Sequence, residues 1–235
     1  AQLLPVSEGL AGVASGTDVY LFLAGMMLLA EIARREGLFD YLAARAARAA
    51  GGSPVRLFTL VYGVGTLVTV FLSNDATAVV LTPAVIAVTR AAKAKDPIPY
   101  LLVCAFVANA ASFVLPISNP ANIVVFGANM PPLGEWLGRF ALPSLAAIVS
   151  TYAVLLLVTR KSLGGRIEPE SETPALSRGG KVAAFGLGLA VIALLTASAL
   201  GADLGLPTAL AGLATLVLVS IGERRSPRPV LGGVS

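Results

Sequence analysis

Asp75 is the residue whose type and position most need a chemical explanation. It lies within FLSNDATAVVLTPAVI, residues 71–86, and it is the only charged residue between Leu57 and Thr89. A carboxylate at the centre of a membrane helix costs about 2.5–3.5 kcal/mol, so intramembrane acids mark ion or proton pathways. Burial favours the protonated form of such a group, whereas a helix N-terminus starting at Ala76 favours the anion. We therefore predict that Asp75 gains and loses a proton as a coupling group.

Small polar side chains lie beside Asp75 and recur in a second apolar stretch. That stretch is NAASFVLPISNPANIVVF, residues 109–126, where Pro116 and Pro120 interrupt helical hydrogen bonding. Hydroxyl and amide groups at such breaks satisfy freed backbone groups or coordinate a ligand. The polar residues in question are Ser73, Asn74, Asp75 and Thr77 in the first stretch and Ser112, Ser118, Asn119 and Asn122 in the second. A proline kink whose polar residues serve only neighbouring helices is the alternative for the second stretch.

The composition places these residues in a membrane protein. The chain of 235 residues is 56% hydrophobic, has a mean hydropathy of +0.84 and is 13% charged, whereas soluble domains carry about 25% charged residues. With no histidine and a single cysteine, it lacks a disulfide framework and the usual cysteine and histidine metal sites. The net charge of +4 does not indicate nucleic-acid binding, because the basic residues are arranged as membrane-topology charges. We expect no cofactor, no bound metal and no enzyme activity.

The positions of the basic residues predict the topology. They cluster at 34–56, 90–95, 160–181 and 224–228, as cytoplasmic loops of membrane proteins do. With all four clusters in the cytoplasm, the apolar segments connect consistently. These segments are 17–33, 57–89, 98–128, 140–159, 182–200 and 204–221. Segment 57–89 must then leave the cytoplasm and return to it, and Arg139 is the one basic residue outside these clusters.

Segment 57–89 is too short for two full crossings. Its arms, Leu57–Leu72 and Ala76–Thr89, fall below the roughly 20 residues that a spanning helix needs. We therefore predict a re-entrant hairpin that turns inside the membrane, where irregular backbone is tolerated only beside protein or water. Two short tilted helices joined by a polar turn at the far surface are the alternative. A hairpin paired with a broken helix over 98–128 is typical of the binding site of a secondary transporter.

These motifs resemble those of a known family. FLSNDATAVVLTP, SFVLPISNPANIVVFG and AGMMLLAEIARREGLFDYLA are similar to the arsenical pump membrane protein family of the ion-transporter superfamily. That superfamily also holds sodium-coupled dicarboxylate transporters and sodium/proton antiporters. The resemblance implies an all-α membrane protein with an inverted-repeat fold, in which each repeat contributes a re-entrant hairpin and a broken transmembrane helix. It also implies a substrate- or ion-binding site in two parts. Ser73, Asn74, Asp75 and Thr77 would form the hairpin part, and Ser118, Asn119 and Asn122 the broken-helix part.

The resemblance further implies how the chain is divided. Residues 1–160 would form the first transport repeat, incomplete at its N-terminus, residues 161–181 a cytoplasmic linker, and residues 182–235 the opening helices of the second repeat. Because members of the family are about twice as long, we expect the chain to be a fragment.

The implied function is export of arsenite or antimonite across the cytoplasmic membrane of a prokaryote, in exchange for protons. The dicarboxylate carriers have Ser-Asn-Thr where this chain has Ser73-Asn74-Asp75, and the added negative charge would repel a dianion. A sodium/proton antiporter and an organic-anion transporter stay open as alternatives, as does an uncoupled structural membrane module. The implied partners are membrane lipid, arsenite or antimonite, and protons, with a cytoplasmic ATPase subunit and a second copy of the chain as further candidates. We expect no nucleic acid.

Four other features carry expectations of their own. Glu31 stands three and four residues before Arg34 and Arg35, which predicts a local ion pair in preference to a proton relay. Cys104 is expected to be a small core residue in preference to an arsenic ligand. Residues 34–56 predict an amphipathic helix at the membrane interface. Trp136 is expected in the interfacial aromatic belt.

Overall fold

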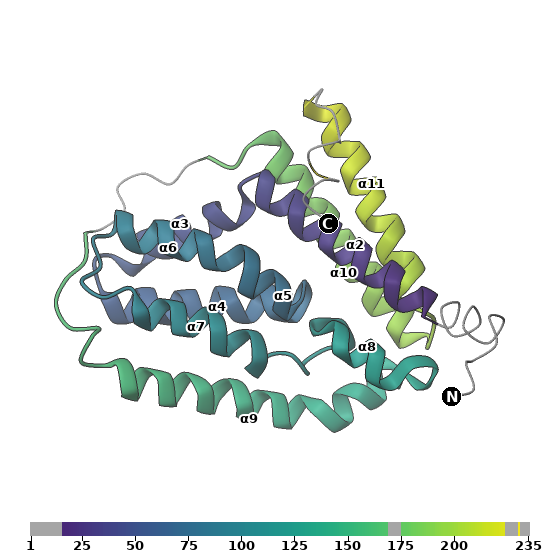
Figure 1. Cartoon of the computed structure of the whole chain (residues 1–235), viewed down its shortest axis with the longest axis horizontal. Coiled ribbons are helices and arrows are strands. Elements are labelled where there is room, and N and C mark those ends of the chain that lie inside the picture. Colours follow the sequence, from purple (N-terminus) through teal and green to yellow (C-terminus); the bar gives the residue numbers. More distant parts are fainter. Residues whose placement is uncertain (1–15, 169–174, 224–229, 231–235) are drawn as a thin grey trace, which may run out of the picture.

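The computed structural model describes residues 16–168, 175–223 and 230, and these residues fold as an assembly of helices (Figure 1). No β-strand occurs within those ranges, which confirms the all-α prediction. Residues 1–15 of the expected first repeat and the basic cluster at 224–228 lie outside the described residues.

The α-helices are separated by short turns and by two interruptions. They are α2 (Thr17–Arg35), α3 (Leu38–Ala50), α4 (Pro54–Phe71), α5 (Asn74–Ala76), α6 (Thr82–Ala91), α7 (Ile98–Ala110), α8 (Pro120–Phe126), α9 (Leu133–Thr159), α10 (Arg178–Ala199) and α11 (Gly205–Glu223). A π-helical turn, η1 (Thr77–Leu81), joins α5 to α6, and the 3-10 turns η2 (Pro116–Ser118) and η3 (Gly127–Asn129) flank α8. Within the described ranges, α4, α9, α10 and α11 are long and apolar enough to cross a membrane.

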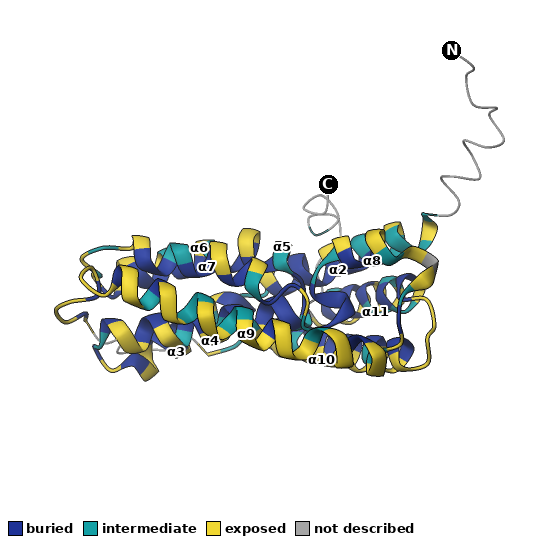
Figure 2. Cartoon of the chain, turned by 90° about the horizontal axis from the view of Figure 1, so that it is seen from below, coloured by how far each residue is buried: buried dark blue, intermediate teal, exposed yellow. Residues whose placement is uncertain are grey.

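The helices form two groups (Figure 1). In the first, α3 packs on α4, α4 on α7 and α7 on α9, and α6 covers α3 and α7. In the second, α11 packs between α2 and α10 and the three helices run obliquely to the first group. Much of the outer surface is apolar: Leu142, Val158 and Val125 each expose more than 70% of their area, and exposed positions lie along the outside of the helices in Figure 2. Such a surface is suited to lipid contact.

Residues 54–91 form a helical hairpin. Ser53 caps α4, its Oγ accepting a hydrogen bond from the Arg56 amide at 3.3 Å, and Pro54 occupies the first turn. The chain leaves the helix at Leu72 and Ser73 and then runs back through α5, η1 and α6 as one continuous helical arm. Pro83 has no amide proton to donate, and the π-helical turn immediately before it accommodates that missing bond.

The helix expected over residues 98–128 is interrupted. Helix α7 has 13 residues, which gives about 20 Å, well short of the roughly 30 Å of a bilayer core. The chain then passes through turns and η2 before α8 starts at Pro120. Because Pro116 and Pro120 both lack an amide proton, the interruption falls where the sequence predicts it.

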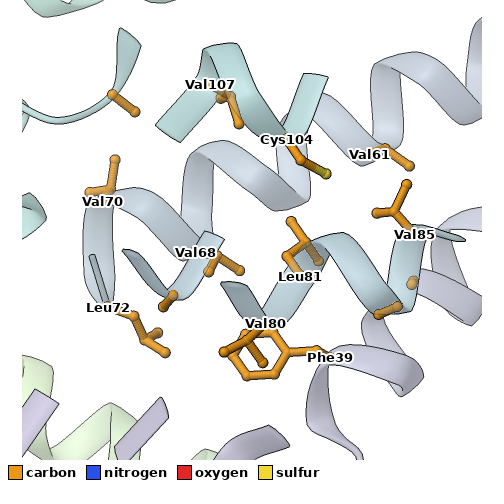
Figure 3. Close-up of a cluster of buried hydrophobic side chains, with 14 of the residues drawn as sticks. Phe39, Val61, Val68, Val70, Leu72, Val80, Leu81, Val85, Cys104 and Val107 are labelled. Atoms are coloured by element: carbon orange, nitrogen blue, oxygen red, sulfur yellow. The ribbon is translucent and has the colours of Figure 1, made fainter. Parts of the chain in front are cut away.

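A continuous apolar core lies beneath the hairpin. Val68 from one arm and Val80, Leu81 and Val85 from the other meet Cys104 and Val107 of α7, with Phe39 of α3 below them (Figure 3). Cys104 is 1% exposed, which confirms its assignment to the core.

Two expectations need correction. The predicted amphipathic helix is present as α3, but its apolar face packs against α4 and α6, so protein and not lipid covers that face. Trp136 is fully buried, packing against Phe126 and Phe140 at ring-centroid distances of 5.3 and 4.4 Å. It therefore fills the inside of the fold next to the interrupted helix and does not join an outer aromatic belt.

Candidate functional site

The turn of the hairpin is built by short side-chain caps. Ser73 is extended and 5% exposed, and its Oγ accepts a hydrogen bond from the Ala76 amide at 3.2 Å. The Asn74 Oδ1 accepts from the Asp75 amide at 2.9 Å. These two bonds satisfy amides at the start of the returning arm, which lack helical partners. The Asp75 carboxylate is exposed and makes no hydrogen bond or ion pair with another described residue.

Thr77 ties the two arms together. Its Oγ1 lies 2.8 Å from the Thr69 Oγ1, and the Thr69 hydroxyl donates to the Gly65 carbonyl at 2.8 Å. Both threonines are completely buried. Gly65 also lets α4 pack closely against α7, because a Cβ there would lie 2.7 Å from Val107 Cγ1. Thr77 therefore acts first as a bridge within the hairpin.

The three predicted residues of the interrupted helix hold its backbone. The Ser118 Oγ accepts from the Leu115 amide at 3.0 Å, and the Asn119 Oδ1 accepts from the Ala121 amide at 2.9 Å. The Asn122 Nδ2 donates to the Ser112 and Pro116 carbonyls at 3.0 and 3.3 Å. These bonds satisfy amides and carbonyls that the break frees from helical pairing.

The turn and the break are in contact. The Ser118 Oγ also donates to the Val70 carbonyl at 3.0 Å, in the last turn of α4. From the other side, the Trp136 Nε1 of α9 donates to the Phe113 carbonyl at 3.0 Å. The two polar stretches, about 40 residues apart in the sequence, therefore form one polar region between helices of the first group.

A cleft of about 140 Å³ opens beside this region. It lies between α2, the returning arm of the hairpin and the start of α8, and its lining residues are Leu23, Met26, Met27, Ala30, Glu31, Ser73, Asp75, Ala76, Val79, Val80 and Pro120. Of the predicted site residues, Ser73 and Asp75 line the cleft. Asn74, Thr77, Ser118, Asn119 and Asn122 do not, although Asn119 directly precedes Pro120.

The wall supplied by α2 was not among the predicted site residues. Met26, Met27 and Glu31 are the members of this wall that carry sulfur or charge. Leu23, Met26, Met27, Ala30 and Glu31 follow the spacing of one helical face, which is the signal that could have identified the wall. The periodicity alone does not say which other element this face meets.

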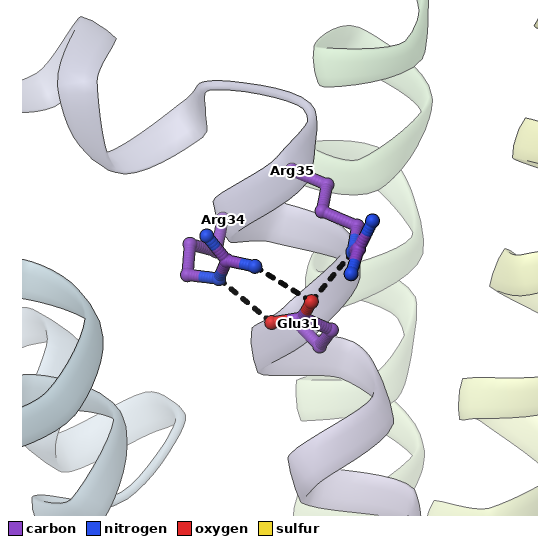
Figure 4. A network of polar contacts seen from close by, with 3 residues as sticks. All are labelled: Glu31, Arg34 and Arg35. Carbon is purple, nitrogen blue, oxygen red and sulfur yellow. Dashed lines mark hydrogen bonds and ion pairs between the residues drawn. The ribbon is translucent and has the colours of Figure 1, made fainter. Parts of the chain in front are cut away.

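Glu31 is held by two arginines (Figure 4). Its carboxylate accepts two hydrogen bonds from Arg34 at 2.7 Å each and one from Arg35 at 2.5 Å. The Glu31 side chain is 8% exposed, and those of Arg34 and Arg35 are 46% and 33% exposed. The predicted local ion pair is confirmed. Of the two carboxylates that line the cleft, Glu31 is therefore paired with arginine, and Asp75 has no basic partner among the described residues. No group of three or more histidine, cysteine or acidic residues gathers as a metal site within the described ranges.

Similar proteins are bacterial membrane transporters. An arsenical pump membrane protein of Escherichia coli is 28% identical over 231 residues, covering 94% of this chain and 51% of the relative. One of Yersinia enterocolitica is 27% identical over 227 residues, with the same coverage. An uncharacterized transporter of Mycobacterium tuberculosis is 31% identical over 108 residues, which is 46% of this chain and 25% of that protein. The chain spans about half the length of the arsenical pump relatives.

The family comparison covers the whole chain. The family described as citrate transporter matches residues 1–235, and the relatives bear names of transporters, not of enzymes. Apolar helices long enough to cross a membrane agree with a multi-pass membrane protein. By this match along its full length, the chain belongs to the citrate transporter family, and the arsenical pump membrane proteins are among its relatives.

Proposed function

We propose that the chain is part of a secondary active transporter that exports arsenite or antimonite across the cytoplasmic membrane in exchange for protons. The observation that carries the proposal is the Asp75 carboxylate, which lines a cleft between two helices and an interrupted segment and has no basic partner there. A group in that position can bind a proton in one transport state and release it in the other.

The charge of the cleft favours a neutral substrate over a polyanionic one. Its lining contains Asp75 and the arginine-paired Glu31 but no lysine or arginine, so a dianion would meet net negative charge. Arsenite and antimonite are neutral hydroxides near pH 7 and avoid that repulsion. The apolar and thioether side chains of α2 also favour a weakly hydrated solute. A citrate-like substrate, which the family description suggests, would need positive charge from elsewhere.

Sodium is the second candidate substrate. A carboxylate and nearby hydroxyl and carbonyl oxygens are suitable ligands for a hard cation, and Ser73 lines the cleft with Asp75. An uncoupled structural module is disfavoured, because such a module gains nothing from a carboxylate at this depth.

The hairpin supports a re-entrant placement. The linker after α9 contacts both of its ends: the Ile167 amide donates to the Gly52 carbonyl at 3.1 Å, and the Glu168 amide to the Ala92 carbonyl at 2.9 Å. Helix α4 has 18 residues and α9 has 27, which corresponds to about 27 and 40 Å. An arm that starts level with the end of α9 and is about 13 Å shorter would turn within the membrane.

In the proposed transporter, Ser73, Asn74, Asp75, Thr77, Ser118, Asn119 and Asn122 form one half of the transport site. Since the arsenical pump relatives are about twice as long as this chain, a related second hairpin and broken helix would supply the other half. Residues 1–160 would then belong to a first repeat, 161–181 to a cytoplasmic linker and 182–235 to the start of an inverted second repeat. Membrane lipid surrounds the protein, and a cytoplasmic ATPase subunit and a second copy are the proposed protein partners.

Replacing Asp75 by asparagine tests the proposal. Asp75→Asn keeps the size of the side chain and removes the titrating group, so we expect loss of proton-driven arsenite efflux. The measurement is arsenite uptake into everted vesicles at several external pH values, using a protein of the relatives' full length that contains this chain. Asp40→Asn, an exposed acid of α3 that does not line the cleft, is the matched control. Wild-type efflux and pH dependence in Asp75→Asn would contradict the proposal, and sodium-dependent flux without arsenite flux would support the second candidate.

A further inference from the structure

A second polar cleft lies at the other end of α2. Its volume is about 50 Å³. It is lined by residues from α2, from α8 and the α8–α9 connection, and from the end of α10 and the α10–α11 turn. Asp18 and Asp203 bring two carboxylates to it, and Ser198 brings a hydroxyl. None of these residues belongs to the candidate transport site.

Asp18 joins two of these elements. It lies in the first turn of α2, and its Oδ1 accepts a hydrogen bond from the Gly205 amide at 2.5 Å, where α11 starts. A Cβ at position 205 would lie 2.2 Å from the Asp18 carbonyl oxygen, so the two backbones are closely packed. Asp203, two residues earlier, is therefore held near Asp18, and both residues line the same cleft. Two carboxylates that line one small cleft repel each other unless a counter-charge lies between them.

The Ser198 hydroxyl is an independent sign of a missing ligand. Ser198 is 4% exposed and lines the cleft, yet its Oγ has no hydrogen-bond partner within the described residues. Buried hydroxyls are almost always paired, because leaving one unpaired costs about 1–3 kcal/mol. An oxygen ligand of this kind is paired when a cation or its bound water occupies the cleft.

The sequence offers no basic counter-charge at this position. Segments 1–33, 97–138 and 182–222 contain no lysine or arginine, and the cleft is built from residues of these segments. Neither Asp18 nor Asp203 forms an ion pair within the described ranges. The N-termini of α2 and α11 carry partial positive charge, which offsets part of the negative charge of the two carboxylates but does not replace a bound cation.

We propose that Asp18, Asp203 and Ser198 bind one Ca²⁺ ion in this cleft. Carboxylate, hydroxyl and carbonyl oxygens are the ligands that Ca²⁺ prefers, and its flexible coordination suits ligands drawn from a turn and two helix ends. Mg²⁺ demands stricter octahedral geometry and gives up its water reluctantly. The bound ion links the α10–α11 turn to α2. Because the predicted topology puts this turn on the side opposite the basic loops, we expect the affinity of an extracellular Ca²⁺ module, about 10⁻⁴–10⁻³ M.

Equilibrium dialysis of the purified chain with radioactive Ca²⁺ in an uncharged detergent tests the proposal. We expect one ion per chain, with weaker competition by Mg²⁺ than by unlabelled Ca²⁺. Asp203→Asn removes a carboxylate that makes no hydrogen bond or ion pair with another described residue, so it should leave the fold intact and weaken binding about tenfold or more. Ser198→Ala should weaken binding by a smaller factor.

Glu135→Gln is the matched control. Glu135 is an acid in the first turn of α9, where it pairs with Arg139 at 3.3 Å outside the cleft. Its replacement should leave Ca²⁺ binding unchanged. Absence of bound Ca²⁺ at about 10 mM, ten times the weakest expected dissociation constant, would overturn the proposal. So would equal Ca²⁺ binding by the wild-type, Asp203→Asn and Glu135→Gln chains, since it would place the ion elsewhere.

Discussion

Ser118 connects the interrupted helix to the hairpin through one hydroxyl group. Its Oγ accepts from the Leu115 amide and donates to the Val70 carbonyl, each at 3.0 Å, and the residue is completely buried. Removing the hydroxyl leaves an amide and a carbonyl without partners in an environment that water does not reach. The contact between the two polar stretches therefore depends on this residue.

Ser118→Ala should destabilise the fold by about 1–3 kcal/mol, the usual penalty for orphaned buried polar groups. Ser150→Ala is the matched control, because the Ser150 Oγ donates to the Ala147 carbonyl at 3.2 Å on an exposed face of α9. Thermal or denaturant unfolding in detergent measures both variants. Equal stability of the two would mean that the Ser118 bridge does not hold the hairpin against the break.

Residue types predicted where the apolar segments break better than they predicted which side chains face the cleft. The acid, amides and hydroxyls were correctly located at breaks in apolar segments, because only freed backbone groups or ligands need them there. Which side chains face the cleft depended on tertiary contacts: Thr77 turns toward Thr69, while Met26 and Glu31 enter from α2. From a single sequence we could not predict that α2 packs beside the hairpin.

At the scale of elements, prolines and local polarity predicted where helices end. Pro116 and Pro120 place the break between α7 and α8, and Ser73 places the turn of the hairpin. The environment of α3 was not predictable in the same way. Its alanine-rich face can cover lipid or protein equally well, and the structure packs it on α4 and α6. Small apolar residues indicate that a face is buried, but they do not indicate whether lipid or protein covers it.

The contact between α2 and α11 depends on glycine. A Cβ at Gly25 would lie 2.6 Å from both the carbonyl carbon and the carbonyl oxygen of Thr208, and a Cβ at Gly212 would lie 3.0 Å from the Gly25 carbonyl oxygen. The atoms in the way are backbone and cannot rotate aside. Small residues at such crossings let membrane helices approach closely.

Gly25→Ala should therefore push α11 away from α2 and destabilise the fold by about 1–3 kcal/mol. Gly63→Ala on α4 is the matched control, since no atom lies within 4 Å of its added Cβ. That variant should be unchanged or up to about 1 kcal/mol more stable, because alanine favours a helix over glycine. Unfolding measurements in detergent that show no difference between the two variants would contradict the close packing.

At the scale of the molecule, loops from three basic clusters come together. The linker after α9 bonds to the α3–α4 connection and to the end of α6, and Lys93 pairs with Glu168 at 2.8 Å. Leu163 and Ile167 of this linker are buried in the core. A shared end that gathers basic loops agrees with a cytoplasmic face under the positive-inside rule. The sequence predicted which loops share a side, but not that the linker docks against them.

The predicted topology determines which positions can be labelled from each side of the membrane. If the basic loops are cytoplasmic, Arg45 and Arg90 face the cytoplasm, Ala202 faces the outside, and Asp75 lies between them at membrane depth. All four positions are exposed on the isolated chain, so protein does not shield them from reagents. In a Cys104→Ala background, single changes Arg45→Cys, Arg90→Cys, Asp75→Cys and Ala202→Cys can be labelled in intact cells and in everted vesicles with a bulky impermeant maleimide. We expect Ala202→Cys to react only in cells, Arg45→Cys and Arg90→Cys only in everted vesicles, and Asp75→Cys much more slowly than all three from either side. Labelling of Asp75→Cys in intact cells as fast as Ala202→Cys would instead place the turn at the outer surface, making the hairpin two ordinary crossings and Asp75 a surface cap.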